Sequence, residues 1–184
     1  MTVSNMPDAQ FNTSDHQFMA RALQLARRGI ATSHPNPRVG CVLVKDNQVL
    51  ARAGRQNSSG DSANEMDHAE VMALRQLLGD QPNVDCSDIT AYSTMQPCPM
   101  CYSTLLLSGV RKFVWAYEDI MGGGTDLPLN ELPVLYADMQ VEVIPRVLRA
   151  DSLALFQEFF RRFEYWRDSP LAEYTLAQKP EQKE

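Results

Sequence analysis

The 184-residue sequence has no hydrophobic run long enough to cross a bilayer, which takes about 20 consecutive apolar residues. Its first residues, MTVSNMPDAQFNTSDHQF, contain no hydrophobic segment of the kind found in signal peptides. The 4 cysteines are irregularly spaced, so the pattern of a disulfide framework is also missing. We therefore expect a protein of the reducing cytoplasm without a membrane segment.

Basic residues are in deficit: 17 lysines and arginines stand against 23 aspartates and glutamates, a formal net charge of -6. This balance argues against a broad phosphate-binding surface, although a local basic cluster is compatible with it. The richest run of arginines, from Arg146 to Arg167, is interleaved with carboxylates. What is present is an ordinary globular composition, 44% hydrophobic and 22% charged, at a length that suits one domain.

Local motifs predict where the first helix and strands lie. Ser14 and Gln17 fit a capping box, which would begin a helix with an apolar stripe at helical spacing. VGCVLVKDNQVLARA, residues 39–53, predicts a β-hairpin with its turn at Asp46 and Asn47. The expected apolar stripe of the first helix consists of Phe18, Met19, Ala22, Leu23 and Ala26.

Further strands and helices are expected to alternate along the chain, which indicates an α/β sheet covered by helices on its faces. A short helix within LPVLYADM, residues 132–139, would make the last two strands parallel. The other expected helices are 68–79, 98–108 and 151–166, the last of them interpreted as a packing helix, and the other expected strands are 89–94, 111–117 and 140–145.

PCPMC places Cys98 and Cys101 at the start of an expected helix, which is typical of a redox pair or of half a zinc site. A helix N-terminus favours the thiolate form. His68 begins the preceding helix, so one imidazole and two thiolates converge if the two helices start side by side. Catalytic zinc sites have this number of protein ligands and leave the fourth position for water. Glu70, two residues after His68, would handle protons beside the metal.

His-Ala-Glu followed by Pro-Cys-x-x-Cys matches the signature of zinc deaminases. From about residue 14 to residue 162, the chain resembles the cytidine/deoxycytidylate deaminase superfamily. Residues 1–13 are polar and aperiodic, so a flexible arm is expected there, and a polar tail is expected over residues 169–184. The resemblance implies a three-layer α/β/α sandwich with a mixed, five-stranded sheet, and a single deaminase domain over residues 14–168. It also implies one Zn²⁺ per chain on His68, Cys98 and Cys101, Glu70 as general acid/base, and a homodimer or higher homo-oligomer.

The implied reaction is hydrolytic removal of an exocyclic amine from a purine or pyrimidine, with release of ammonia. Two motifs resemble different branches of the superfamily, and these branches imply different substrates. HPNPRVGCVLVKDNQVLARAG resembles the deaminase domain of riboflavin biosynthesis, whereas STMQPCPMCYSTLLLSGVRKFVWAYED resembles tRNA adenosine deaminases and guanine and cytosine deaminases. Gln96 departs from the glutamate that the latter relatives usually carry. We favour a free base or nucleoside, because a small neutral substrate needs no basic surface; tRNA and the pyrimidine of riboflavin biosynthesis are the alternatives.

Simpler interpretations remain open at this point. A redox pair would leave His68 and Glu70 without a role, and a structural zinc site would normally need a fourth protein ligand. A catalytically dead zinc scaffold is the non-enzymatic alternative. The expected substrate contacts are Asn57, Ala69 and Asp119; Asn57 falls where tRNA adenosine deaminases place a base-contacting asparagine, but it could be only a turn residue. Asp119 could shape the pocket rim or belong to a surface loop.

Overall fold

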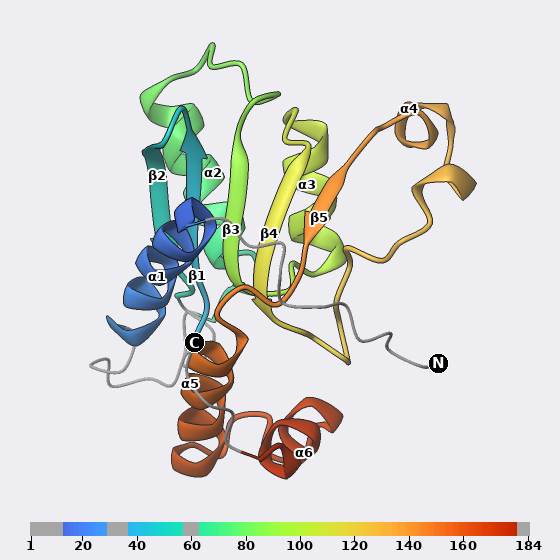
Figure 1. Ribbon diagram of the computed structural model, residues 1–184. Coiled ribbons are helices and arrows are strands. Elements are labelled where there is room, and N and C mark those ends of the chain that lie inside the picture. Colours follow the sequence, from blue (N-terminus) through green and yellow to red (C-terminus); the bar gives the residue numbers. More distant parts are fainter. Residues whose placement is uncertain (1–12, 29–36, 57–62, 180–184) are drawn as a thin grey trace.

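The computed structural model describes residues 13–28, 37–56 and 63–179, so the expected arm at 1–13 falls almost entirely outside it. Five strands form one sheet in the order β2-β1-β3-β4-β5 (Figure 1). β1 pairs antiparallel with β2 and β3, whereas β4 is parallel to β3 and β5. The mixed five-stranded sheet is therefore confirmed. The strand bounds are β1 (Gly40–Lys45), β2 (Gln48–Gly54), β3 (Thr90–Met95), β4 (Lys112–Tyr117) and β5 (Glu142–Ile144).

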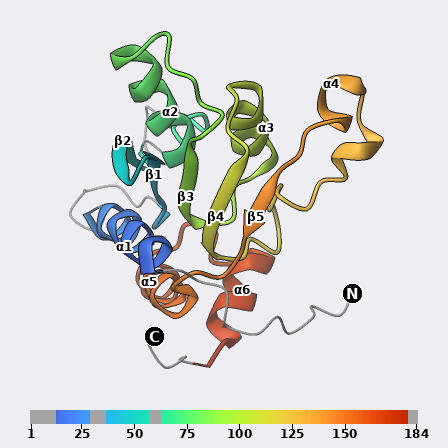
Figure 2. The same ribbon diagram turned by 45° about the horizontal axis from the view of Figure 1, so that its top comes forward.

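Helices cover both faces of the sheet and complete three layers. α1 (Thr13–Arg28) packs on one face, and α2 (Ala69–Asp80) and α3 (Pro99–Leu107) pack on the other (Figures 1 and 2). The predicted apolar stripe of α1 is confirmed, because all of its residues are buried. Two separate hydrophobic clusters follow, one between α1 and the sheet and one between the sheet and α2 with α3.

The connections agree with the local turn chemistry. Asp46 and Asn47 join β1 to β2 with φ of 52° and 58°, and positive φ at both central residues is what a type I′ hairpin turn requires. The excursion between β4 and β5 contains a 3₁₀ turn (Leu129–Glu131) and the short helix α4 (Val134–Ala137). This crossover makes β4 and β5 parallel, as expected.

The C-terminal region corrects two expectations. α5 (Arg149–Arg162) ends before residue 166, because Phe163 takes an extended backbone with φ -122° and ψ 147°. Residues 170–177, expected in the polar tail, form helix α6 (Pro170–Ala177). Ser169 caps this helix by accepting a hydrogen bond from the Ala172 amide at 3.1 Å. Leu171 is buried as well, so a segment too short to show periodicity is stabilised by packing against the remainder of the core.

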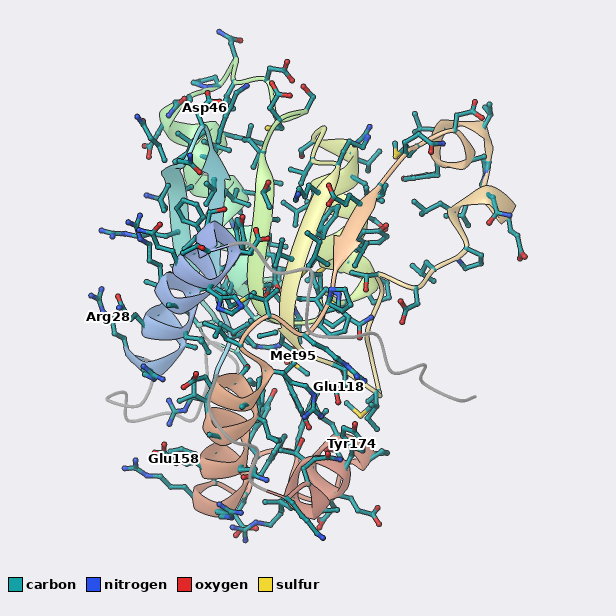
Figure 3. All side chains as sticks on the ribbon, in the orientation of Figure 1. Arg28, Asp46, Met95, Glu118, Glu158 and Tyr174 are labelled. Carbon is teal, nitrogen blue, oxygen red and sulfur yellow. The ribbon has the colours of Figure 1, made fainter. Side chains whose placement is uncertain are left out.

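Buried polar contacts attach α5 and α6 to the end of β4. The Arg149 guanidinium donates from Nε to Glu118 Oε2 at 2.7 Å, and the Tyr174 hydroxyl donates to Glu118 Oε1 at 2.6 Å. Figure 3 shows Glu118 and Tyr174 near each other below the sheet. Burial opposes ionisation of Glu118, but hydrogen bonds from Arg149 and Tyr174 outweigh it and lower the pKa of the carboxyl. Both C-terminal helices are thereby held beside the end of the sheet where β3 and β4 terminate.

Candidate active site

The N-termini of α2 and α3 present the side chains that the sequence analysis singled out. His68 is the N-cap of α2 and Cys98 the N-cap of α3, and both have extended backbones. Pro99 occupies the first turn of α3, where its missing N–H costs no helical hydrogen bond. Neither capping side chain accepts a bond from its own helix, so the imidazole and the thiol are available to other partners.

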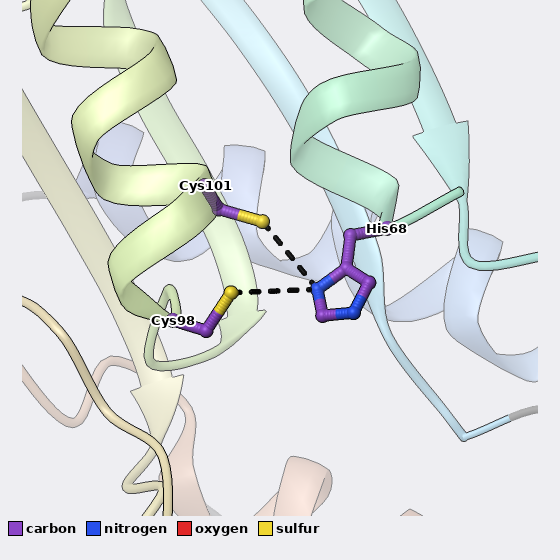
Figure 4. A group of neighbouring side chains, drawn as sticks. All are labelled: His68, Cys98 and Cys101. Atoms are coloured by element: carbon purple, nitrogen blue, oxygen red, sulfur yellow. Dashed lines mark hydrogen bonds between the residues drawn. The ribbon is translucent and has the colours of Figure 1, made fainter. Parts of the chain in front are cut away.

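One imidazole and two sulfurs converge between these helices (Figure 4). His68 Nδ1 lies 3.6 Å from Cys98 Sγ and 3.4 Å from Cys101 Sγ. In a tetrahedral zinc site with ordinary bond lengths, a nitrogen and a sulfur ligand are about 3.6 Å apart. The donor atoms of all three residues lie within 4.8 Å of one another, so His68, Cys98 and Cys101 could hold a metal ion. Three protein donors leave one tetrahedral position for water or substrate.

The two thiols have opposite electrostatic surroundings. A hydrogen bond from Cys101, supported by one from His68, lowers the pKa of Cys98 to about 4 against the opposing effect of burial. The same bond to Cys98, together with burial, raises the pKa of Cys101 far above its ordinary value. The two thiols therefore titrate as a coupled pair. A metal ion held by both sulfurs would bind them as thiolates, so metal binding would release thiol protons.

Glu70 lies beside this group in the first turn of α2 and is only 3% exposed. The Ser93 hydroxyl donates to Glu70 Oε1 at 2.6 Å, and the Cys101 thiol lies 3.5 Å from Oε2. Sequence reasoning missed Ser93. The signal that could have found it is the alternation of β3, which places a serine between Ala91 and Met95 on the buried α2–α3 face.

A cavity of about 160 Å³ opens in front of these side chains. Ala69 and Asp119 line it together with His68, Glu70 and Cys98, whereas Asn57 lies outside the described residues. The segment 151–166, interpreted as a packing helix, does pack, but it also supplies all of the aromatic residues that line the cavity. Sequence reasoning missed this wall, because residues of α5 and of the following turn reach the site only through the folding of the chain. The aromatic lining residues are Phe156, Phe159, Phe160, Tyr165 and Trp166.

Buried Gln96 holds the loop that follows β4 against the metal-binding turn. Its side-chain amide donates to Thr125 Oγ1 at 2.7 Å and to Asp126 Oδ2 at 3.2 Å, and its Oε1 accepts from the Asp119 amide at 3.3 Å. At Gly124, a Cβ would lie 2.5 Å from the Pro99 nitrogen, so only glycine permits this approach. Gln96 therefore pairs with a carboxylate across the loop, which a glutamate at this position would repel.

We expect Gln96→Glu to lower the free energy of unfolding by about 1 kcal/mol, because it places a carboxylate beside Asp126 and removes an amide donor. The effect is limited because Asp126 is exposed and water screens the repulsion. Urea denaturation at neutral pH measures the change. The double variant Gln96→Glu/Asp126→Asn should recover most of the loss, and a double variant no more stable than the single one would contradict this pairing.

The fold and the site define an α/β protein in which one histidine and two cysteines meet at paired helix N-termini and could hold a metal ion. Residues 12–117 match the family model of the cytidine and deoxycytidylate deaminase zinc-binding region. The chain belongs to this deaminase family, whose members are hydrolytic enzymes.

Individual relatives fall into the two branches indicated by the motifs. The riboflavin biosynthesis protein RibD of Escherichia coli is 40% identical over 111 residues, which cover 57% of this chain and 27% of RibD. A tRNA-specific adenosine deaminase of Streptococcus pyogenes is 28% identical over 145 residues, covering 79% of this chain and 89% of that protein. The chain thus spans less than half the length of the RibD relatives it matches.

The fold also matches solved structures. NE0047, solved in complex with 2,6-diaminopurine, superposes with a TM-score of 0.64 at 22% identity, covering 82% of this chain and 83% of that one. This likeness concerns the fold alone and confirms the expected cytidine deaminase-like sandwich.

Proposed function

We propose that this chain is a zinc-dependent hydrolase that removes an exocyclic amine from a purine or pyrimidine, with a free base or nucleoside as the favoured substrate. The observation that carries the proposal is Glu70, a buried carboxylate that lies next to the His68, Cys98 and Cys101 donor group without being part of it. A proton carrier beside a metal position with one open site is the requirement of hydrolytic deamination.

In this proposal His68, Cys98 and Cys101 hold the zinc ion, which supplies a water of near-neutral pKa when bound. Glu70 accepts a proton from the attacking water and passes it to the ring nitrogen. It then takes the proton of the hydroxyl newly bonded to the ring carbon and delivers it to the amino group, which leaves as ammonia while the carbonyl forms. Ser93 keeps the carboxylate oriented through its 2.6 Å hydrogen bond. Because Glu70 is buried, bulk water does not compete for these protons.

The cavity supports a small planar substrate. Its volume of about 160 Å³ is below the range of about 300–1,000 Å³ that is usual for drug-sized ligands. Aromatic side chains from α5 and the turn after it offer flat apolar surfaces against which a base could stack. Ala69 and Asp119 are the proposed substrate contacts among the described residues, and Asn57 stays a prediction.

A tRNA substrate is the second candidate, because the tRNA-specific relative aligns over most of its own length. Three arginines of the run from Arg146 to Arg167 favour a small molecule instead, since they are already paired with carboxylates. Arg162 lies 4.0 Å from Glu158, and Arg149 and Arg167 pair with Glu118 and Glu164. The pyrimidine of riboflavin biosynthesis is a further candidate, supported by the 40% identity to RibD.

Ammonia release from a panel of bases, nucleosides, nucleotides and tRNA tests the substrate. We expect turnover of a free base or nucleoside, with kcat/KM nearly constant between about 50 and 200 mM salt, because no phosphate contact is involved. A protein that makes many phosphate contacts would lose about 10³- to 10⁵-fold in affinity over the same range. Turnover of tRNA with a steep salt dependence, and of no small substrate, would favour the second candidate.

The cytoplasmic location and the homo-oligomer stay predictions. Across residues 13–28, 37–56 and 63–179, the helices are too short or too polar to cross a membrane. Sedimentation of the purified protein measures the oligomeric state.

A further inference from the structure

Glu65 lies on the side of the His68 ring that faces away from the sulfurs. His68 Nδ1 is directed at Cys98 and Cys101, while His68 Nε2 lies 3.8 Å from Glu65 Oε2. A histidine that ligates a metal through one nitrogen usually donates the other N–H to a carboxylate, a carbonyl or water, and this bond determines the tautomer and the ring orientation. Glu65 therefore occupies the position of such a partner.

Local backbone geometry places Glu65 beside the ring. The Met66 amide donates to Asn64 Oδ1 at 3.0 Å, and the Asp67 amide donates to the Asn64 carbonyl at 3.1 Å. These bonds form a turn immediately before α2, in which Glu65 precedes His68 by three residues.

Two further side chains, Arg55 and Tyr165, interact with the Glu65 carboxylate. Arg55 Nη2 donates to Glu65 Oε2 at 2.8 Å, and the Arg55 side chain is only 8% exposed, whereas that of Glu65 is 65% exposed. Burial raises the pKa of the Tyr165 hydroxyl, and the charges of Glu65 and Arg55 act on it as well. Arg55 lies in the same connection between β2 and α2 as Glu65, whereas Tyr165 lies between α5 and α6.

We propose that Glu65 is a positioning residue for His68: it accepts a hydrogen bond from Nε2–H and thereby keeps the Nδ1 lone pair directed at the metal position. The inference rests on the proposed zinc site. At 3.8 Å the two atoms are farther apart than in a hydrogen bond, so the carboxylate faces the ring at ion-pair distance. The bond itself is expected when Nδ1 is engaged by the metal.

The test measures how firmly the zinc-loaded protein holds its metal. Zinc release to a chromogenic chelator is followed for wild type, Glu65→Ala, Glu65→Gln and the control Glu131→Gln, which changes an exposed carboxylate in the 3₁₀ turn. We expect release from Glu65→Ala to be about 10–100 times faster than from wild type. The rate of zinc release from Glu65→Gln should lie between those of wild type and Glu65→Ala, because the amide oxygen still accepts a hydrogen bond from Nε2–H but carries no charge. The control should match wild type.

A second readout separates ligand geometry from general destabilisation. With Co²⁺ in place of zinc, the visible absorption bands report the ligand field, and we expect them to shift in Glu65→Ala and to a smaller extent in Glu65→Gln. If Glu65→Ala does not fold, the zinc release rate and the Co²⁺ spectrum of Glu65→Gln test the inference.

If both Glu65 variants release zinc at the wild-type rate and give the wild-type Co²⁺ spectrum, the inference is wrong, although the proposed zinc site would stand. A wild-type protein that retains no zinc would instead overturn the proposed function.

Discussion

Cys98→Ala and Cys101→Ala are each expected to lose the bound zinc and, with it, all measurable deamination. Each variant removes one of three protein donors that lie within 4.8 Å of one another, and the remaining two make a weak site. Metal analysis should give about one zinc per wild-type chain and almost none in the variants. Ammonia release by the same preparations measures the activity.

Cys86→Ala is the matched control, because Cys86 is a buried free cysteine that does not belong to the metal-binding group. It should keep both zinc and activity. A redox Cys-x-x-Cys pair would behave differently, since it would cycle through a disulfide and need no metal. Full activity of an exhaustively demetallated wild-type protein would refute the deaminase proposal.

Glu70→Gln is expected to keep zinc and fold but to lose activity by about 10²- to 10⁴-fold, because an amide cannot carry protons. The substituted side chain has nearly the same shape, and its oxygen can still accept the hydrogen bond from Ser93. Zinc content and thermal unfolding should therefore stay close to wild type. Steady-state ammonia release gives kcat and KM, and the loss should appear in kcat.

Glu173→Gln, an exposed substitution on α6, is the control for removing a glutamate charge and should be fully active. Loss of zinc from Glu70→Gln would identify the carboxylate as a ligand and show that the proposed role is wrong. Unchanged turnover would mean that another residue carries the protons.

The sequence alone was sufficient for the features that local patterns encode. Helical spacing identified the buried face of α1, and Asp46 with Asn47 identified the hairpin turn, because both depend only on neighbouring residues. The three candidate metal-binding residues could also be picked out from the sequence, because His68 and the pair Cys98 and Cys101 each stand at the start of a helix. Their convergence required only that two helices begin at the same edge of one sheet.

Tertiary structure alone decided what surrounds that donor set. The Ser93–Glu70 hydrogen bond and the Gln96 contacts to the loop after β4 join residues from different elements, and the Arg55–Glu65 pair closes the connection between β2 and α2. No periodicity or turn motif specifies such contacts, because they depend on how loops close and how helices dock.

The C-terminal segment illustrates the same limit. Residues 170–177 read as a polar tail, yet they form a helix whose Leu171 lines the cavity. Its stability comes from apolar side chains packed against distant residues of the core and from the hydrogen bond between Tyr174 and Glu118, not from helix propensity in so short a segment. The sequence thus determined the chemistry of the donor group, whereas packing determined the shape of the cavity in which a substrate would meet it.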